Sequence, residues 1–175
     1  MKPFMMCHRL AVLGVLCALV LAGCDSADSA LESAACESRT GNSMAARVNG
    51  DAVCTDLGTA LLLDVPGPRL SVVGLFANGR SSISFSVENP AVGTFDLADA
   101  TAENDAMYGQ EDETAYFVDR TEGSGTVTIT ELTDTRVKGT FAFTGIGYDV
   151  NLDATGDQAE VTDGTFDFAV ATTTP

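Results

Sequence analysis

The sequence predicts an all-β protein, an antiparallel β-sandwich or flattened barrel of roughly nine to eleven short strands. Three observations support this fold class. From residue 44 onward, apolar and polar residues alternate with a period of two. Clusters of Gly, Asn, Asp and Pro separate the alternating segments. Finally, no segment carries apolar residues at the three- and four-residue spacing that would give a helix a useful hydrophobic face.

The chain begins with a basic segment that is followed by an apolar one. Residues 1–9 contain Lys2 and Arg9 and no acidic residue, and residues 10–22 are all apolar or small. This apolar run of 13 residues ends just before Asp25, whereas a helix needs about 20 apolar residues to span a bilayer. The pattern therefore predicts a secretory signal peptide over residues 1–23 and not a retained transmembrane helix.

The predicted signal peptide ends in L-A-G, and Cys24 follows it, so that residues 21–24 have the sequence L-A-G-C. These four residues resemble the lipobox of bacterial lipoproteins. The resemblance implies that Cys24 receives a diacylglycerol on its sulfur and becomes the N-terminus after cleavage behind Gly23. The alternative is an unmodified apolar cysteine, which we expect for Cys7 and Cys17. Because two or more acyl chains anchor a protein stably, we expect an exported protein held by lipid at a bacterial membrane, the outer membrane or cell surface more than the inner membrane.

The charge of the chain limits its partners. The formal net charge is −16, and it becomes −18 when residues 1–23 are removed with Lys2 and Arg9. Only Lys138 then remains as a lysine, so no basic patch is available to neutralise nucleic-acid phosphates. Anionic headgroups should also repel the domain, so the acyl chains on Cys24 would have to hold it at the membrane. The acids are spread along the chain, as expected for a role in solubility, and binding of calcium or another cation is the alternative.

Three cysteines follow the signal peptide: Cys24, Cys36 and Cys54. If Cys24 is acylated, an even pair remains. In an exported protein this pair suggests a disulfide between Cys36 and Cys54. Two free thiols are the alternative, because the sequence alone does not fix the distance between them.

Residues 24–43 are small and polar and predict a flexible acidic linker, which is followed by one β domain over residues 44–175. The domain opens with a hairpin over residues 45–55, in which Asn49 and Gly50 form the tight turn. A second Asn-Gly pair at 78–79 indicates another hairpin. The remaining predicted strands lie at 59–65, 70–77, 80–87, 93–97, 114–119, 125–132, 136–143, 148–152, 159–162 and 164–170.

One motif, G-T-F-x-[LF], occurs three times, at residues 93–97, 139–143 and 164–168. In a strand the glycine, the phenylalanine and the last apolar residue share one face. The spacings are unequal, so the copies do not form a solenoid array. The phenylalanines are expected to be core residues, since large aromatics supply much of a small β core. A ligand-stacking row is the alternative.

Four segments carry a resemblance to a known family: A-R-V-N-G at 46–50, G-T-V-T-I-T at 125–130, G-T-F-A-F at 139–143 and V-T-D-G-T-F-D-F at 161–168. They resemble an uncharacterised family of secreted and lipid-anchored β domains of Bacteroidota-type bacteria. The resemblance covers residues 44–170 and implies a β domain, but it implies no activity and transfers no site residue. In that family an aromatic residue, often tryptophan, follows the N-G turn. In this chain Val53 and Cys54 occupy that region, and the chain has no tryptophan.

The residue inventory predicts no catalytic residue and no cofactor. The single histidine, His8, lies in the signal peptide, which removes the commonest general base and metal ligand from the mature chain. Carboxylates remain, above all in the acidic segment at residues 96–119. We therefore expect a non-catalytic domain that scaffolds or binds a protein or carbohydrate partner. A calcium- or small-ligand-binding module using residues 96–119 is the alternative, and a carboxylate-dependent glycosidase is the remote one.

Overall fold

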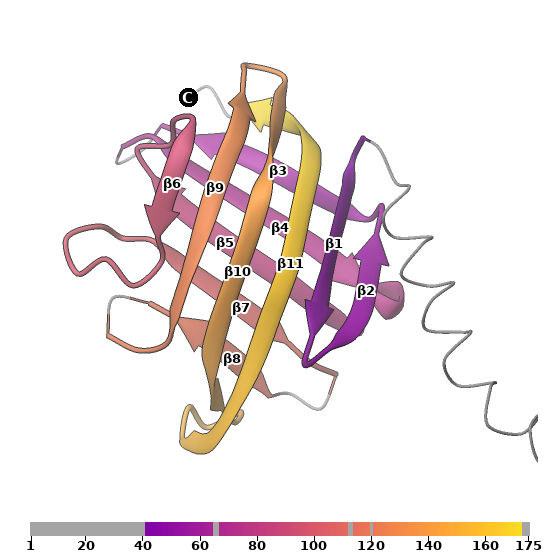
Figure 1. Cartoon of the computed structure of the whole chain (residues 1–175), viewed down its shortest axis with the longest axis vertical. Coiled ribbons are helices and arrows are strands. Elements are labelled where there is room, and N and C mark those ends of the chain that lie inside the picture. The colour runs from indigo at the N-terminus through magenta and orange to yellow at the C-terminus, as the bar shows by residue number, and fades with distance from the viewer. Residues whose placement is uncertain (1–40, 65–66, 112–113, 120, 173–175) are drawn as a thin grey trace, which may run out of the picture.

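The computed structural model describes residues 41–172 except 65–66, 112–113 and 120 (Figure 1). The predicted signal peptide, Cys24, Cys36 and most of the predicted linker lie outside these residues. The strands are β1 Ser43–Val48, β2 Asp51–Thr55, β3 Gly58–Leu63, β4 Arg69–Phe76, β5 Ser81–Glu88, β6 Gly93–Asp96, β7 Asp105–Gly109, β8 Ala115–Val118, β9 Ser124–Leu132, β10 Arg136–Tyr148 and β11 Ala154–Thr172. Within the described ranges the one helical element is a 3-10 turn, η1 Ala77–Gly79, and no helix is long and apolar enough to cross a membrane. The all-β prediction is confirmed.

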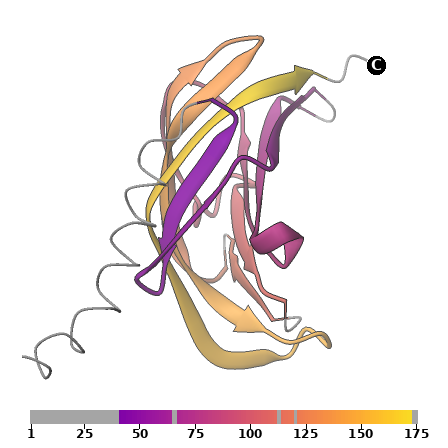
Figure 2. The same ribbon diagram turned by 90° about the vertical axis from the view of Figure 1, so that its right-hand side faces the viewer.

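The strands form two layers that pack face to face (Figure 2). One layer has the order β6-β9-β10-β11-β1-β2 and the other has the order β3-β4-β5-β7-β8. The long strands β10 and β11 pair with each other and also join the two layers. Near its end β10 pairs with β8, and β11 pairs with β3. The sandwich is therefore closed along both sides into a flattened barrel.

Three details differ from the sequence-based expectation. The pairing of β11 with β3 is parallel, because closing the barrel brings the end of the last strand beside an early strand. The two strands expected at 159–162 and 164–170 are one strand, β11, which continues through a bulge where Asp163 has a φ of 52°. The strand expected at 148–152 is wrong, since these residues end β10 and form the following turn, whereas β7 was not expected.

The first predicted hairpin is confirmed. Strands β1 and β2 pair antiparallel around Asn49 and Gly50, whose φ angles of 51° and 92° are typical of a tight hairpin turn. Asn49 also fixes the hairpin to β11. Its backbone N–H donates to the carbonyl oxygen of Glu160 at 2.8 Å, and its side-chain oxygen accepts from the backbone N–H of Glu160 at 2.9 Å.

Two copies of the G-T-F-x-F motif pair with each other across β10 and β11. Gly139 lies opposite Phe166, and Phe141 lies opposite Gly164. A Cβ atom added to Gly139 would lie 2.6 Å from Cζ of Phe166, and one added to Gly164 would lie 2.6 Å from Cδ2 of Phe141. Each phenylalanine ring therefore fills the space that a side chain on the facing residue would need, which explains why the motif begins with glycine.

The same rings link the two layers of the sandwich. Phe85, from β5 in the opposite layer, lies with its ring centre 5.5 Å from that of Phe141 and 5.0 Å from that of Phe166. All three side chains are at most 3% exposed. Aromatic pairs at these distances stabilise beyond the area they bury. The prediction that the motif phenylalanines are core residues is confirmed for these strands, and the ligand-stacking alternative is wrong.

We predict that Gly139→Ala destabilises the domain by about 2–3 kcal/mol, because the new methyl group would clash with both the Phe166 ring and the Thr128 carbonyl oxygen. Gly67→Ala is the control, since a Cβ atom there meets nothing within 4 Å, and its effect should be within about 1 kcal/mol. Urea unfolding of the purified domain measures both. Equal effects of the two substitutions would contradict the close approach at Gly139.

Candidate functional site

Of the residues that the sequence analysis singled out, the structure describes Cys54. It lies in β2, opposite Ala45 of β1, and is half-buried. Cys54 is disulfide-bonded, and the four other cysteines of the chain all precede residue 41. The bond therefore ties β2 to the segment that precedes the domain. Cys36 as the partner remains a prediction, and Cys24 also lies outside the described residues.

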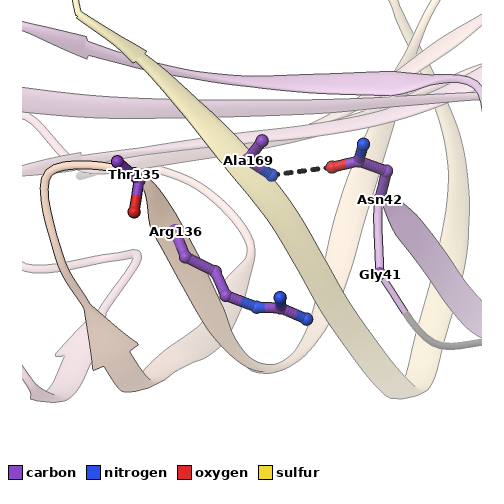
Figure 3. Close-up of a pocket in the computed structure, with 5 residues that line it drawn as sticks. All are labelled: Gly41, Asn42, Thr135, Arg136 and Ala169. Carbon is purple, nitrogen blue, oxygen red and sulfur yellow. Dashed lines mark hydrogen bonds between the residues drawn. The ribbon is translucent and has the colours of Figure 1, made fainter.

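A pocket of about 410 Å³ lies where this segment enters the domain, beside β11 and the turn between β9 and β10 (Figure 3). Asn42, which adopts a φ of 49°, fixes one wall, because its side-chain oxygen accepts a hydrogen bond from the backbone N–H of Ala169 at 2.7 Å. Arg136 extends its guanidinium group beneath β11 toward Gly41. The described residues that line the pocket are Gly41, Asn42, Thr135, Arg136 and Ala169.

A cluster of four charged side chains from β9, β10 and β11 adjoins the pocket. The Oδ2 atom of Asp167 lies 2.7 Å from a guanidinium nitrogen of Arg136 and 3.3 Å from Nζ of Lys138. Lys138 also lies 3.9 Å from Glu131. Two cations and two carboxylates therefore compensate each other, so the pocket wall offers hydrogen-bond donors but little net charge. This suits a neutral polar group more than a strongly charged one.

Asp167 is the centre of this cluster, with a side chain only 19% exposed. Desolvation raises its pKa, but hydrogen bonds and charge from Arg136 and Lys138 outweigh it and hold the pKa below its ordinary value. In turn, the hydrogen bond to Asp167 raises the pKa of Arg136. Two buried atoms, Nε of Arg136 and Oδ1 of Asp167, have no hydrogen-bond partner among the described residues. The ion pairs of the cluster join β10 to β11. None of its groups is arranged as a nucleophile beside a general base.

The acidic segment at 96–119 is not one loop, because β7 and β8 lie within it. Two of its carboxylates form ion pairs with different arginines. Asp105 lies 2.7 Å from a guanidinium nitrogen of Arg69, and Glu111 lies 3.6 Å from one of Arg80. Burial raises the pKa of Asp105, and the Arg69 charge opposes this shift. Within the described part of the chain, no three His, Cys, Asp or Glu side chains converge in a group that could hold a metal ion.

The pocket and the charged cluster were not expected from the sequence. Asn42, Arg136 and Ala169 are far apart in the chain, and only the sheet register brings them together. The one available signal was the position of Lys138, because it is the only lysine after residue 2 and lies in a predicted strand. A cation on a strand face of so acidic a chain indicates a carboxylate on the neighbouring strand.

Comparison with known proteins gives one match. The model of a family described as "Domain of unknown function (DUF6252)" matches residues 67–170, which is more than half of the chain and runs from the turn before β4 into the last part of β11. No curated protein matches the chain, and no solved structure does.

We predict that Asp167→Asn lowers the free energy of unfolding at pH 7 by about 1–2 kcal/mol, since Arg136 and Lys138 lose their shared anion. The pKa of Asp167 is lower in the folded state. Its contribution is therefore complete above its unfolded pKa of about 3.9 and is lost as the pH falls through the folded pKa. Urea unfolding from pH 7 down to pH 3 should show wild type and variant converging at low pH.

The matched control for this experiment is Asp163→Asn. Asp163 also pairs with an arginine, Arg47, but at 3.6 Å and with a side chain 78% exposed. Asparagine tolerates the positive φ of this position, so the expected loss is under about 0.5 kcal/mol. Equal losses for the two variants, or an Asp167→Asn loss that does not change with pH, would contradict the role assigned to Asp167.

We further predict that the partner of Cys54 is Cys36. Proteolysis of the protein purified without reductant should release a peptide pair that contains both residues, identified by mass spectrometry. Closing this short loop should stabilise the domain by roughly 3 kcal/mol, so reduction should lower the melting temperature. A peptide pair joining Cys54 to another cysteine would show that the assignment is wrong.

Proposed function

The chain belongs to the DUF6252 family of domains of unknown function, and we propose that it is a lipid-anchored protein of the cell envelope whose β domain binds or scaffolds and is not an enzyme. The observation that carries this proposal is the junction L-A-G-C at residues 21–24, after a short apolar segment. A thiol at this place is what thioether lipidation requires. The anchor would lie at the outer membrane or on the cell surface.

The distance between anchor and domain supports a tether. Cys24 precedes Gly41, the first described residue, by 17 positions. An extended chain of this length spans at most about 60 Å, which is enough to hold a small domain clear of the headgroups. Because the chain is strongly acidic, the domain itself should avoid anionic lipid, and the acyl chains would supply the attachment.

A disulfide at Cys54 also agrees with export. Disulfides persist in oxidising compartments outside the cytoplasm, and this one joins β2 to the preceding segment. The bond would shorten the free part of the tether and fix where the tether leaves the domain. This arrangement suits a protein that holds its domain at a set place relative to a surface.

Binding or scaffolding is favoured over catalysis by how the described polar groups are used. The sole histidine precedes the proposed cleavage point. The charged side chains with the shortest ion pairs hold strands of one layer together at 2.7 Å. Asp105 of β7 reaches Arg69 of β4 across β5, and Asp167 of β11 pairs with Arg136 of the adjacent β10. Large aromatics fill the space between the two layers. These features support a rigid platform, on which recognition would take place at the outer surface and the loops.

We predict that Cys24→Ser leaves an unprocessed precursor that is poorly retained by membranes, because serine cannot form the thioether. Globomycin, which inhibits the lipoprotein signal peptidase, should give unprocessed wild type. Immunoblots of fractionated cells measure both. Cys36→Ser is the matched control and should mature and remain membrane-bound. Normal maturation of Cys24→Ser would rule out the lipoprotein proposal.

A further inference from the structure

The turn between β10 and β11 exposes two large apolar side chains at one end of the barrel. Val150 is 60% exposed and Leu152 is 74% exposed. The turn lies at the opposite end of the molecule from the start of β1, where the chain enters the domain (Figure 1). Scattered exposed apolar residues are ordinary on protein surfaces, so the case for a function rests on how this turn is built.

The backbone of the turn is held in a strained conformation. Leu152 has a φ of 63°, in the left-handed region that glycine and asparagine occupy readily but that a leucine enters only at a cost in energy. Hydrogen bonds around Asp149 maintain this conformation. Its carboxylate accepts from the backbone N–H of Asn151 at 2.8 Å and of Asp153 at 3.0 Å. The N–H of Leu152 donates to the carbonyl oxygen of Asp149 at 3.0 Å.

The base of the hairpin is braced against the barrel. The hydroxyl of Tyr148 hydrogen-bonds to the carboxylate of Glu122, in the turn between β8 and β9. The ring of Tyr148 meets the ring of Phe117 edge to face, with centres 5.8 Å apart. A Cβ atom on Gly147 would lie 3.0 Å from the ring of Tyr116, so this strand also sits close to its neighbour. The two apolar side chains are thus displayed on a preorganised turn, which lowers the entropy cost of binding.

Acidic residues precede and follow these apolar residues in the chain. Asp149 and Asp153 flank them in the turn, Asp157 follows, and Glu122 lies at the base. The chain has no lysine or arginine after Lys138, so the turn and β11 carry no cation. An anionic lipid surface would repel such a tip, and so would a second copy of this acidic chain.

We propose that Val150 and Leu152 form a docking knob for a partner protein that offers an apolar pocket bordered by lysine or arginine side chains. The apolar side chains would supply the buried contact, and the surrounding carboxylates would select a basic rim and speed the encounter. The strain at Leu152 is then the cost of presenting a large apolar side chain where a turn would otherwise favour glycine or asparagine. This inference deepens the binding role proposed above and names its site.

The test uses the full chain in the cells that make it, with a photoreactive phenylalanine at position 152. Irradiation should give one discrete protein adduct, and mass spectrometry should place the cross-link in an apolar segment next to lysine or arginine. The same group at position 92 is the control, because Val92 is 64% exposed but lies in another loop. No adduct, an adduct with lipid alone, an acidic cross-linked segment, or the same adduct from position 92 would overturn the proposal.

Leu152→Asn separates recognition from structure. Asparagine adopts positive φ more easily, so this variant should melt about 2–4 °C above wild type while its affinity for the purified adduct partner falls at least about tenfold. Wild-type binding should also weaken as salt rises. A variant that melts lower would contradict the strain at Leu152, and one that binds as well as wild type would show that Leu152 is not a binding residue. Maturation at Cys24 is measured separately in each strain, so failure of the knob and failure of the lipid anchor give different results.

Discussion

The close packing of glycine against phenylalanine between β10 and β11 is the constraint on which the rest of the fold depends. These two strands are the longest of the barrel and belong to both layers. Gly139 and Gly164 let the rings of Phe166 and Phe141 lie flat across the strand pair. From that position both rings reach Phe85 on the opposite layer. Strand pairing and layer packing therefore use the same atoms, and neither can change without the other.

The charge of the chain imposes a second constraint. With nine basic residues against 25 acidic ones, most carboxylates have no cation to pair with and must face water. The few pairs with short distances join residues more than 30 positions apart in the chain, as Arg69 joins Asp105 and Arg136 joins Asp167. Other aspartates are used locally. Asp149 accepts hydrogen bonds from the backbone of its own turn, and these bonds lower its pKa. An acidic sequence can thus still have ordered turns.

Sequence patterns predicted the features that depend on local chemistry and missed those that depend on register. Alternation gave the fold class, and Asn49 with Gly50 gave the first hairpin, because both are set by neighbouring residues. The strand β7 was missed because its sequence, DAMYG, combines an acid, small residues and a glycine. The bulge at Asp163 made one long strand resemble two. The pocket beside Arg136 could not be foreseen, since residues 42, 136 and 169 meet only after the barrel closes.

The misread segment 148–152 shows why such errors can point to function. Its alternation of Tyr148, Val150 and Leu152 is that of a strand with one buried face. The structure instead places Val150 and Leu152 in water and gives Leu152 a backbone conformation unsuited to it. Neither local propensity nor packing within the chain accounts for apolar residues here. The core does not use this apolar pattern and the backbone bears strain where it is displayed, so the partner contact proposed above gives the pattern a physical reason.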